Sequence, residues 1–132
     1  MIVVDSCVLI AHLEAGDPHS REALEILDTE DALLVHPLTL SECFVGAIRA
    51  GQEGAFRSAI TRIGIDVWQP DAEHPFRSAR WRVENRLKLP DACILDAAQH
   101  NAATLATFDA ALAAAARRLT VPVVGTGPGW ET

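Results

Sequence analysis

The feature that most constrains this chain is a regular alternation of short strand-like runs with longer segments of helical pattern. The strand-like runs are three or four residues long and lie at residues 2–4, 33–35, 65–68, 104–107 and 121–124. Such runs suit buried strands, and the segments between them are long enough for the helical crossovers that parallel strands require. The alternation therefore predicts an α/β fold in which a short parallel sheet is sandwiched by helices.

Helices are predicted at residues 6–13, 53–62, 75–86, 90–101 and 109–118, from apolar spacing and from residues that favour helix starts. Asp17 and Pro18 resemble an N-cap and a first helical position, which predicts another helix there. Its buried residues are expected to be Ala23, Leu24, Ile26 and Leu27. Residues 39–42 have capping-box spacing, which predicts a helix with Glu42 in its first turn. Its apolar stripe is expected to comprise Leu40, Phe44, Val45 and Ile48.

Length and composition indicate one compact globular domain. The chain has 132 residues, of which 49% are hydrophobic and 22% charged, and we expect a single domain over 1–132 with a glycine- and proline-rich tail at 125–132. The start has no basic segment of a secretory signal, and no apolar stretch approaches the length of a membrane span. We therefore expect a cytoplasmic protein without a membrane partner. Cys7, Cys43 and Cys93 form no CxxC pair, which favours buried thiols over a disulfide or zinc site.

The net charge of −7 is unevenly distributed along the chain. Residues 1–31 carry eight acids and one arginine, whereas from residue 32 onward ten acids balance ten bases. A basic segment stands out within that second part, and it contains Arg77, Arg80, Arg82, Arg86 and Lys88. We interpret this segment as a candidate surface for RNA backbone, with Trp81 in the core of the domain.

Four acids occupy positions where a site could form. Asp5 and Asp109 each follow a predicted strand and precede a helix, while Glu42 and Asp91 fall in first helical turns. In open α/β sheets, sites form at the carboxyl ends of the strands, so all four could meet at one edge. Each also suits an ordinary helix cap or a favourable place near the helix dipole. Spacing alone leaves both interpretations open.

The sequence motifs around these acids resemble those of PIN-domain proteins. The resemblance rests on the segments Asp5-Ser6-Cys7-Val8-Leu9-Ile10, Ser41-Glu42, Leu89-Pro90-Asp91-Ala92 and Thr107-Phe108-Asp109, which follow one another in the order of the family's motifs. The third segment continues into an apolar, alanine-rich helix. Because a compact domain standing alone is typical of VapC-type toxins, the chain most resembles the toxin of a VapBC-type toxin–antitoxin pair.

This resemblance implies a metal-dependent endoribonuclease. Asp5, Glu42, Asp91 and Asp109 would be both the catalytic and the metal-binding residues, with Asp5 and Asp91 as main ligands. Their oxygen ligands suit Mg²⁺ or Mn²⁺. Two further residues, Ser6 and Thr107, are candidates for hydrogen bonds to the carboxylates or to ligand waters, although they also suit ordinary polar positions. The implied partners are an RNA substrate, a cognate antitoxin whose tail occupies the acidic groove, and a second copy in a homodimer.

The sequence departs from the family pattern at two positions. Many members carry a further acid where this chain has Ala111, which favours one metal ion in the resting site. Asp96 stands where the family has a small residue. Five helical positions place it about 140° around the helix from Asp91, so we interpret it as structural or as a surface charge.

Three alternatives compete with the nuclease. The first is a catalytically inactive PIN-fold interaction module whose acids only cap helices. The second is a haloacid-dehalogenase-like phosphatase, which needs an acid where this chain has Cys7. The third is nucleotide binding at the glycines of residues 125–129, but no helix follows them to receive a phosphate. The five histidines, His12, His19, His36, His74 and His100, show no metal-ligand spacing and are given no role.

Overall fold

Five short parallel strands form one sheet in the computed structural model, which describes residues 1–14 and 16–126. The strands are β1 (Ile2–Val4), β2 (Leu33–Val35), β3 (Asp66–Val67), β4 (Thr104–Ala106) and β5 (Val123–Val124). Their order is β3-β2-β1-β4-β5, and every paired neighbour runs parallel. The predicted parallel α/β sheet is confirmed.

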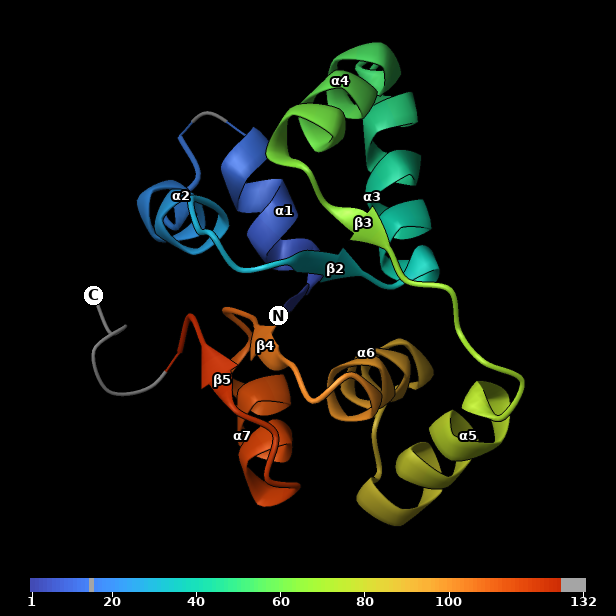
Figure 1. Ribbon diagram of the computed structural model, residues 1–132. Helices are drawn as coiled ribbons and strands as arrows, with labels where there is room; N and C mark the ends of the chain where they lie inside the picture. The colour runs from blue at the N-terminus through green and yellow to red at the C-terminus, as the bar shows by residue number, and fades with distance from the viewer. Residues whose placement is uncertain (15, 127–132) are drawn as a thin grey trace.

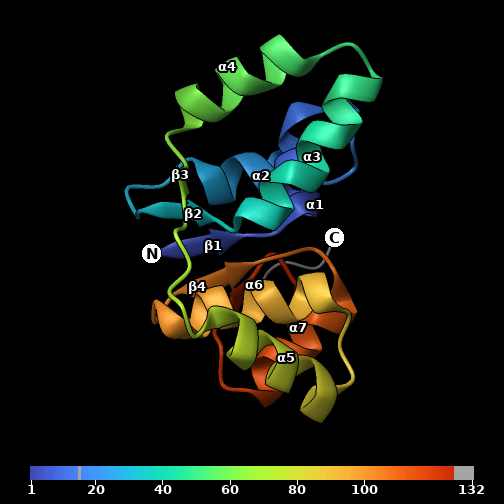
Figure 2. The same ribbon diagram turned by 90° about the vertical axis from the view of Figure 1, so that its right-hand side faces the viewer.

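Helices cover both faces of this sheet, as Figures 1 and 2 show. On one face lie α1 (Ser6–Leu13), α2 (Ser20–Leu27), α3 (Pro37–Arg49) and α4 (Glu53–Ile63). On the other lie α5 (His74–Asn85), α6 (Leu89–His100) and α7 (Ala110–Arg118). The predicted sandwich is therefore confirmed, and none of the helices in the described ranges is long and apolar enough to cross a membrane.

The central strand β1 contributes to two hydrophobic cores. Ile2 and Val4 pack in the core shared with α1, α2 and α3, whereas Val3 packs in the core shared with α6 and α7. Side chains alternate between the faces of a strand, so one three-residue segment joins both halves of the domain. This burial fixes the position of Asp5, the next residue along the chain.

The second helix begins two residues later than predicted. Asp17 does not cap it, because its Oδ1 atom accepts a hydrogen bond from the backbone N–H of His19 within a turn, and α2 starts at Ser20. The helix buries Ala23, Ile26 and Leu27, but Leu24 is 54% exposed. The prediction of a buried Leu24 is therefore wrong.

The predicted capping box at residues 39–42 is also wrong. Proline at the first helical position fixes the required backbone angle, and α3 therefore starts at Pro37 with His36 as its N-cap. Glu42 lies in the second turn and is exposed. The buried side of the helix carries Thr39 and Cys43, whereas the predicted stripe residues Val45 and Ile48 are 46% and 55% exposed.

The end of β5 packs tightly against β4. Gly125 is buried with φ 102°, and a Cβ atom there would lie 2.4 Å from the carbonyl oxygen of Thr107. Glycine is therefore required at this close approach. The predicted tail at 125–132 begins at this buried residue, and its positions 127–132, with the glycines at 127 and 129, lie outside the described residues.

Candidate active site

The candidate site lies where the order of the strands reverses. From β1 the chain proceeds to β2 and β3 on one side of the sheet, then returns to form β4 and β5 on the other. The carboxyl ends of β1 and β4 are adjacent, because Val4 pairs with Ala106. In open parallel sheets this is the position at which ligands bind.

Asp5 directly follows β1 and is 7% exposed. Its Oδ1 atom accepts a hydrogen bond from the backbone N–H of Ser6 at 2.8 Å, which caps α1. Its Oδ2 atom accepts one from the hydroxyl of Thr107 at 2.8 Å. Both carboxylate oxygens are thereby held in place, as a buried carboxylate requires.

Thr107 connects two of the four acids. It is fully buried at the end of β4, and its hydroxyl oxygen also accepts a hydrogen bond from the backbone N–H of Asp109 at 3.0 Å. The predicted contact of Thr107 with a carboxylate is present. For Ser6, the contact with Asp5 is made by its backbone N–H rather than its hydroxyl.

Asp109 is the N-cap of α7, as predicted. Its Oδ1 atom accepts hydrogen bonds from the backbone N–H groups of Ala111 and Leu112 at 2.9 and 3.1 Å. The carboxylate is exposed at the same edge of the sheet as Asp5.

Asp91 lies half-buried in the first turn of α6. Burial raises the pKa of Asp91 above its usual range, and the charges of Asp5, Asp109 and Glu42 raise it further, against a lowering by Lys88. The structure therefore places the other three acids within electrostatic reach of Asp91, and Glu42 acts from the second turn of α3. Among the described residues, their carboxylates do not form a group close enough to share one metal ion without movement.

The donor set of this group fits a hard divalent cation. All four residues offer carboxylate oxygens, which Mg²⁺ and Mn²⁺ prefer. Burial and the charges of the neighbouring carboxylates raise the pKa of Asp91, and a bound cation would offset the repulsion among these carboxylates.

The model of the PIN domain family matches residues 2–118. The chain belongs to the PIN domain family. A chain of a toxin–antitoxin complex from Klebsiella pneumoniae is 30% identical to this one, with a TM-score of 0.73, and the match covers 86% of this chain and 91% of that chain. A search of curated proteins found no match.

Two more distant structures share the fold of this PIN domain. The toxin VapC20 of Mycobacterium tuberculosis, described as cleaving the sarcin-ricin loop, is 19% identical with a TM-score of 0.69, covering 87% of this chain and 95% of that one. A chain of VapBC2 from Rickettsia felis, bound to promoter DNA, is 16% identical with a TM-score of 0.70, covering 94% and 98%. The predicted likeness to VapC-type PIN domains is confirmed.

One of the three cysteines lies inside the candidate site. The thiol of Cys7 donates to Asp5 Oδ2 at 3.2 Å, and its sulfur accepts from the backbone N–H of Phe108 at 3.3 Å. Burial and the charge of Asp5 raise the pKa of Cys7 to about 11, so it remains a protonated donor. Cys43 and Cys93 are buried, as predicted.

A second polar network lies away from the four acids, and sequence reasoning missed it. Asp96 is fully buried in α6, so the surface-charge interpretation is wrong and the structural one is correct. Its Oδ2 atom lies 2.5 Å from His74 Nδ1, and its Oδ1 atom accepts from Arg77 Nε at 2.8 Å. His74 Nε2 in turn lies 2.9 Å from His36 Nε2. Two histidines without an expected role therefore join α3, α5 and α6.

The direction of hydrogen bonding in this network follows from one backbone amide. The N–H of Leu38 donates to His36 Nδ1 at 3.0 Å, so the proton of neutral His36 lies on Nε2 and is donated to His74. His74 then donates from Nδ1 to Asp96. Nitrogen and sulfur atoms of His36, His74 and Cys93 lie within 4.8 Å of one another, as a metal site would need. Because the His36 Nε2 atom carries a proton, hydrogen bonds explain this cluster better than a metal ion.

The basic segment needs one correction. Arg77 faces inward, donating to Asp96 and, through Nη2, to Asp71 Oδ1 at 2.6 Å, so it is not free for RNA backbone. Trp81, predicted in the core, is half-buried and donates from Nε1 to Asp96 Oδ1 at 3.3 Å. The remaining basic residues of the segment, Arg80, Arg82, Arg86 and Lys88, are exposed.

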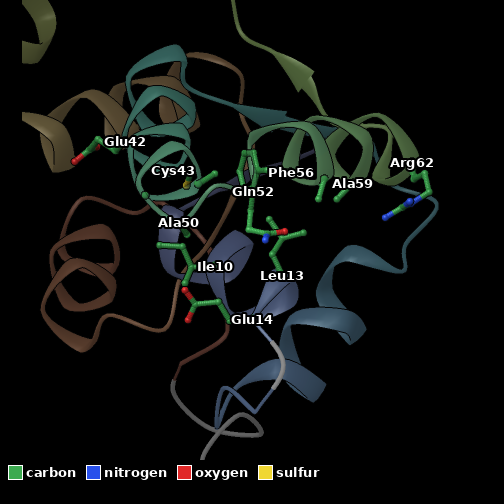
Figure 3. Close-up of a pocket in the computed structure, with 13 residues that line it drawn as sticks. Ile10, Leu13, Glu14, Glu42, Cys43, Ala50, Gln52, Phe56, Ala59 and Arg62 are labelled. Atoms are coloured by element: carbon green, nitrogen blue, oxygen red, sulfur yellow. The ribbon is translucent and has the colours of Figure 1, made fainter.

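An apolar groove of about 400 Å³ runs between α1, α3 and α4. Figure 3 shows Glu42 at one end and Arg62 at the other. Its lining includes Ile10, Leu13, Ala47, Ala50, Phe56 and Ala59. Glu42, one of the four candidate acids, therefore lines this groove.

Proposed function

We propose that this PIN domain is a Mg²⁺- or Mn²⁺-dependent endoribonuclease and the toxin of a VapBC-type toxin–antitoxin pair. One observation carries the proposal: burial and the negative charges of Asp5, Asp109 and Glu42 together raise the pKa of Asp91 above its usual range. Similarity to a chain of a toxin–antitoxin complex and to the toxin VapC20 supports a toxin ribonuclease over other kinds of nuclease.

Each acid has its own part in this proposal. Asp5, oriented by Thr107 and by the N–H of Ser6, is a fixed ligand, and Asp91 is the second main ligand. Glu42 and Asp109 complete the coordination or hold ligand waters. A bound divalent ion would supply an activated water and neutralise charge on the scissile phosphate. The exposed Arg80, Arg82, Arg86 and Lys88 are proposed to contact RNA backbone.

A cognate antitoxin is the proposed inhibitor. The groove between α1, α3 and α4 suits a partner segment with apolar side chains, ending in a basic side chain that pairs with Glu42 and the other acids. If the neighbouring gene encodes this antitoxin, its product should abolish cleavage, and Ala50→Arg at the exposed edge of the groove should restore it. Unchanged inhibition of Ala50→Arg would contradict this assignment of the surface. A homodimer is also proposed, from the family resemblance.

Cleavage of a mixed cellular RNA pool tests the proposed activity. The wild-type chain should cleave RNA with Mg²⁺ or Mn²⁺ and not in excess EDTA. Asp5→Asn and Asp91→Asn should each lower the rate by at least about 100-fold, because each removes a proposed ligand charge. Asp28→Asn, at an exposed acid that ends α2, is the matched control and should cleave normally.

Two results would contradict the proposal. Full cleavage activity of the wild type in EDTA, or of Asp91→Asn with metal, would show that the acids do not act by binding a metal ion. Absence of cleavage by folded wild-type protein with either metal would favour the inactive interaction module instead. The phosphatase alternative is set aside, because the match to the PIN family covers residues 2–118.

A further inference from the structure

Side-chain hydrogen bonds cross between the two helical layers, and the residues that lead into them, at two places. At the first, Thr107 donates to Asp5, and neighbouring residues add two further contacts. The second joins the Nε2 atoms of His36 and His74, which lie 2.9 Å apart. In the part of the chain that the structure describes, no other side-chain hydrogen bond crosses between the layers.

The second of these links connects the two helices that carry Glu42 and Asp91. It begins at His36, the N-cap of α3, which is the helix of Glu42. It continues through His74, whose Nδ1 atom donates to Asp96 of α6, the helix of Asp91. We call this link the histidine bridge; its members are His36, His74 and Asp96.

Apart from the histidine bridge, α3 and α6 belong to different parts of the core. The apolar side chains of α3 pack with those of α1 and α2, whereas those of α6 pack with α7. Figure 2 shows the two helices on opposite faces of the sheet. Glu42 lies six residues after His36, about 9 Å along α3. Asp91 lies five residues before Asp96, about 7.5 Å along α6, so both acids are close to the bridge.

The histidine bridge is buried and is anchored at its far end. His36 and His74 are each 6% exposed, and the ring of Trp68 lies 5.7 and 4.8 Å from theirs between centroids. Exclusion of water strengthens hydrogen bonds of this kind. Asp96 is held independently, because it accepts two hydrogen bonds from Arg77 at 2.8 and 3.0 Å. The bridge therefore ties α3 to a fixed point on α6.

We propose that His74 is a positioning residue of the candidate metal site, because its two hydrogen bonds hold α3 at a fixed distance from α6 and so set Glu42 relative to Asp91. This inference rests on the proposed function, in which these acids hold the ion. Their carboxylates must move to share one ion. With α3 tied to α6, side-chain movement is sufficient, whereas an untied α3 would also lose backbone freedom on binding, which weakens affinity.

Double electron–electron resonance measures this restraint without any metal. Spin labels on Arg49→Cys and Gln99→Cys, at exposed positions of α3 and α6, report the distance between the two helices. The labelled chain carries Cys7→Ser, which keeps a hydrogen-bond donor beside Asp5, while the other two native cysteines are buried.

Two substitutions of His74 distinguish its hydrogen bonds from its volume. His74→Phe keeps a ring but makes neither hydrogen bond, so the distribution of distances should widen. His74→Gln should restore the narrow distribution, because its amide can accept from His36 and donate to Asp96. Both variants should fold, since Asp96 retains its hydrogen bonds to Arg77.

Calorimetric titration with Mn²⁺ measures the consequence for the site. His74→Phe should bind Mn²⁺ at least about 5-fold more weakly than wild type, and His74→Gln should recover most of the affinity. In a Glu42→Gln background, His74→Phe should cause no further loss, because the acid that it positions is gone. In an Asp109→Asn background the losses should add. Ile26→Ala, in the core beneath α2, is the control and should lower stability while leaving Mn²⁺ affinity unchanged.

Three outcomes would overturn the positioning role. They are equal distance distributions for His74→Phe and its parent, Mn²⁺ binding by His74→Phe as tight as or tighter than wild type, and a full additional loss in the Glu42→Gln background. These outcomes differ from failure of the proposed function. If the distances change and the wild type binds no Mn²⁺, the restraint stands and the metal site fails. If Asp91→Asn loses affinity and His74→Phe does not, the metal site stands and the positioning role fails.

Discussion

The geometry around Asp5 depends on a single hydroxyl group. Thr107 donates to Asp5 and accepts from the backbone of Asp109, so one buried side chain fixes the carboxylate of one acid and the backbone of another. Because Thr107 is fully buried, its contribution is positional.

Removing this hydroxyl should therefore impair both activity and stability. Thr107→Val keeps the shape of the side chain but leaves the Asp109 amide without its partner, and should cost about 1–3 kcal/mol of unfolding free energy. RNA cleavage by the folded protein should fall, whereas Thr107→Ser should restore it. Rates and urea unfolding of the two variants provide the measurement. Equal cleavage by Thr107→Val and wild type would show that Asp5 needs no such orientation.

At the residue scale, the sequence indicated candidate site residues but not the polar contacts around them. The order of motifs singled out Asp5, Glu42, Asp91 and Asp109 as candidates, because these motifs are local. It could not identify the partners of Asp96, since His74 is 22 residues away and is reached only when α5 packs on α6. Exposure of an acid cannot be told from its helical angle when a neighbouring helix covers that side.

At the scale of elements, a buried charge holds α5 against α6. Asp96 is fully buried and meets both His74 and Arg77, and these contacts keep its pKa below the usual range despite the opposing effect of burial. Such a carboxylate stabilises the helix pair only while its partners remain charged or hydrogen-bonded to it.

Asp96→Asn should lower the free energy of unfolding by about 3 kcal/mol, because it leaves Arg77 and His74 beside a neutral group. Urea unfolding followed by circular dichroism provides the measurement. Glu84→Gln, at an exposed acid of α5, is the control and should stay within about 0.5 kcal/mol of wild type. If both variants unfolded alike, the network would contribute no net stability.

The cap of α3 makes the fold sensitive to acid. Burial and the neighbouring His74, opposed by the charge of Asp96, lower the pKa of His36 from 6.5 to about 4. The folded state therefore favours neutral His36. Its contribution to stability is complete above pH 6.5 and is lost as the pH falls toward 4, a change on the order of 3 kcal/mol.

Unfolding free energies between pH 4.5 and 7.5 check this prediction. His36→Asn should remain able to cap α3 through its side-chain oxygen but cannot titrate, so its stability should depend less on pH. It should also be less stable at pH 7, because the hydrogen bond to His74 is lost. The same pH slope in wild type and His36→Asn would contradict the assignment.

The order of elements was predictable because strand-like and helix-like periodicities differ. The boundaries of α2 and α3 were less predictable. Asp17 forms a local turn instead of a cap, and His36 caps α3 in place of a residue of the usual capping types. The acceptor atom of a histidine is set by its surroundings, so the sequence gives no simple indication of such a cap.

At the scale of the whole molecule, the sheet joins two layers that each supply part of the candidate site. Asp5 caps α1 and Glu42 lies in α3, whereas Asp91 lies in α6 and Asp109 caps α7. Figure 2 shows α1 and α3 on one face of the sheet and α6 and α7 on the other. The proposed site depends on β1 and β4 being neighbours, because this pairing puts Asp5 and Asp109 at one edge of the sheet. The sequence indicated parallel strands, but the pairing of β1 with β4 depends on packing between distant segments.

The central claim is that these four carboxylates form one site for a divalent cation, and calorimetric titration with Mn²⁺ tests it most directly. Wild-type protein should bind Mn²⁺, and binding should weaken on acidification, because the raised pKa of Asp91 lets protons compete with the cation. Asp91→Asn should bind at least about 10-fold more weakly, whereas Asp28→Asn should bind normally. Equal affinity of Asp91→Asn and wild type would contradict the claim.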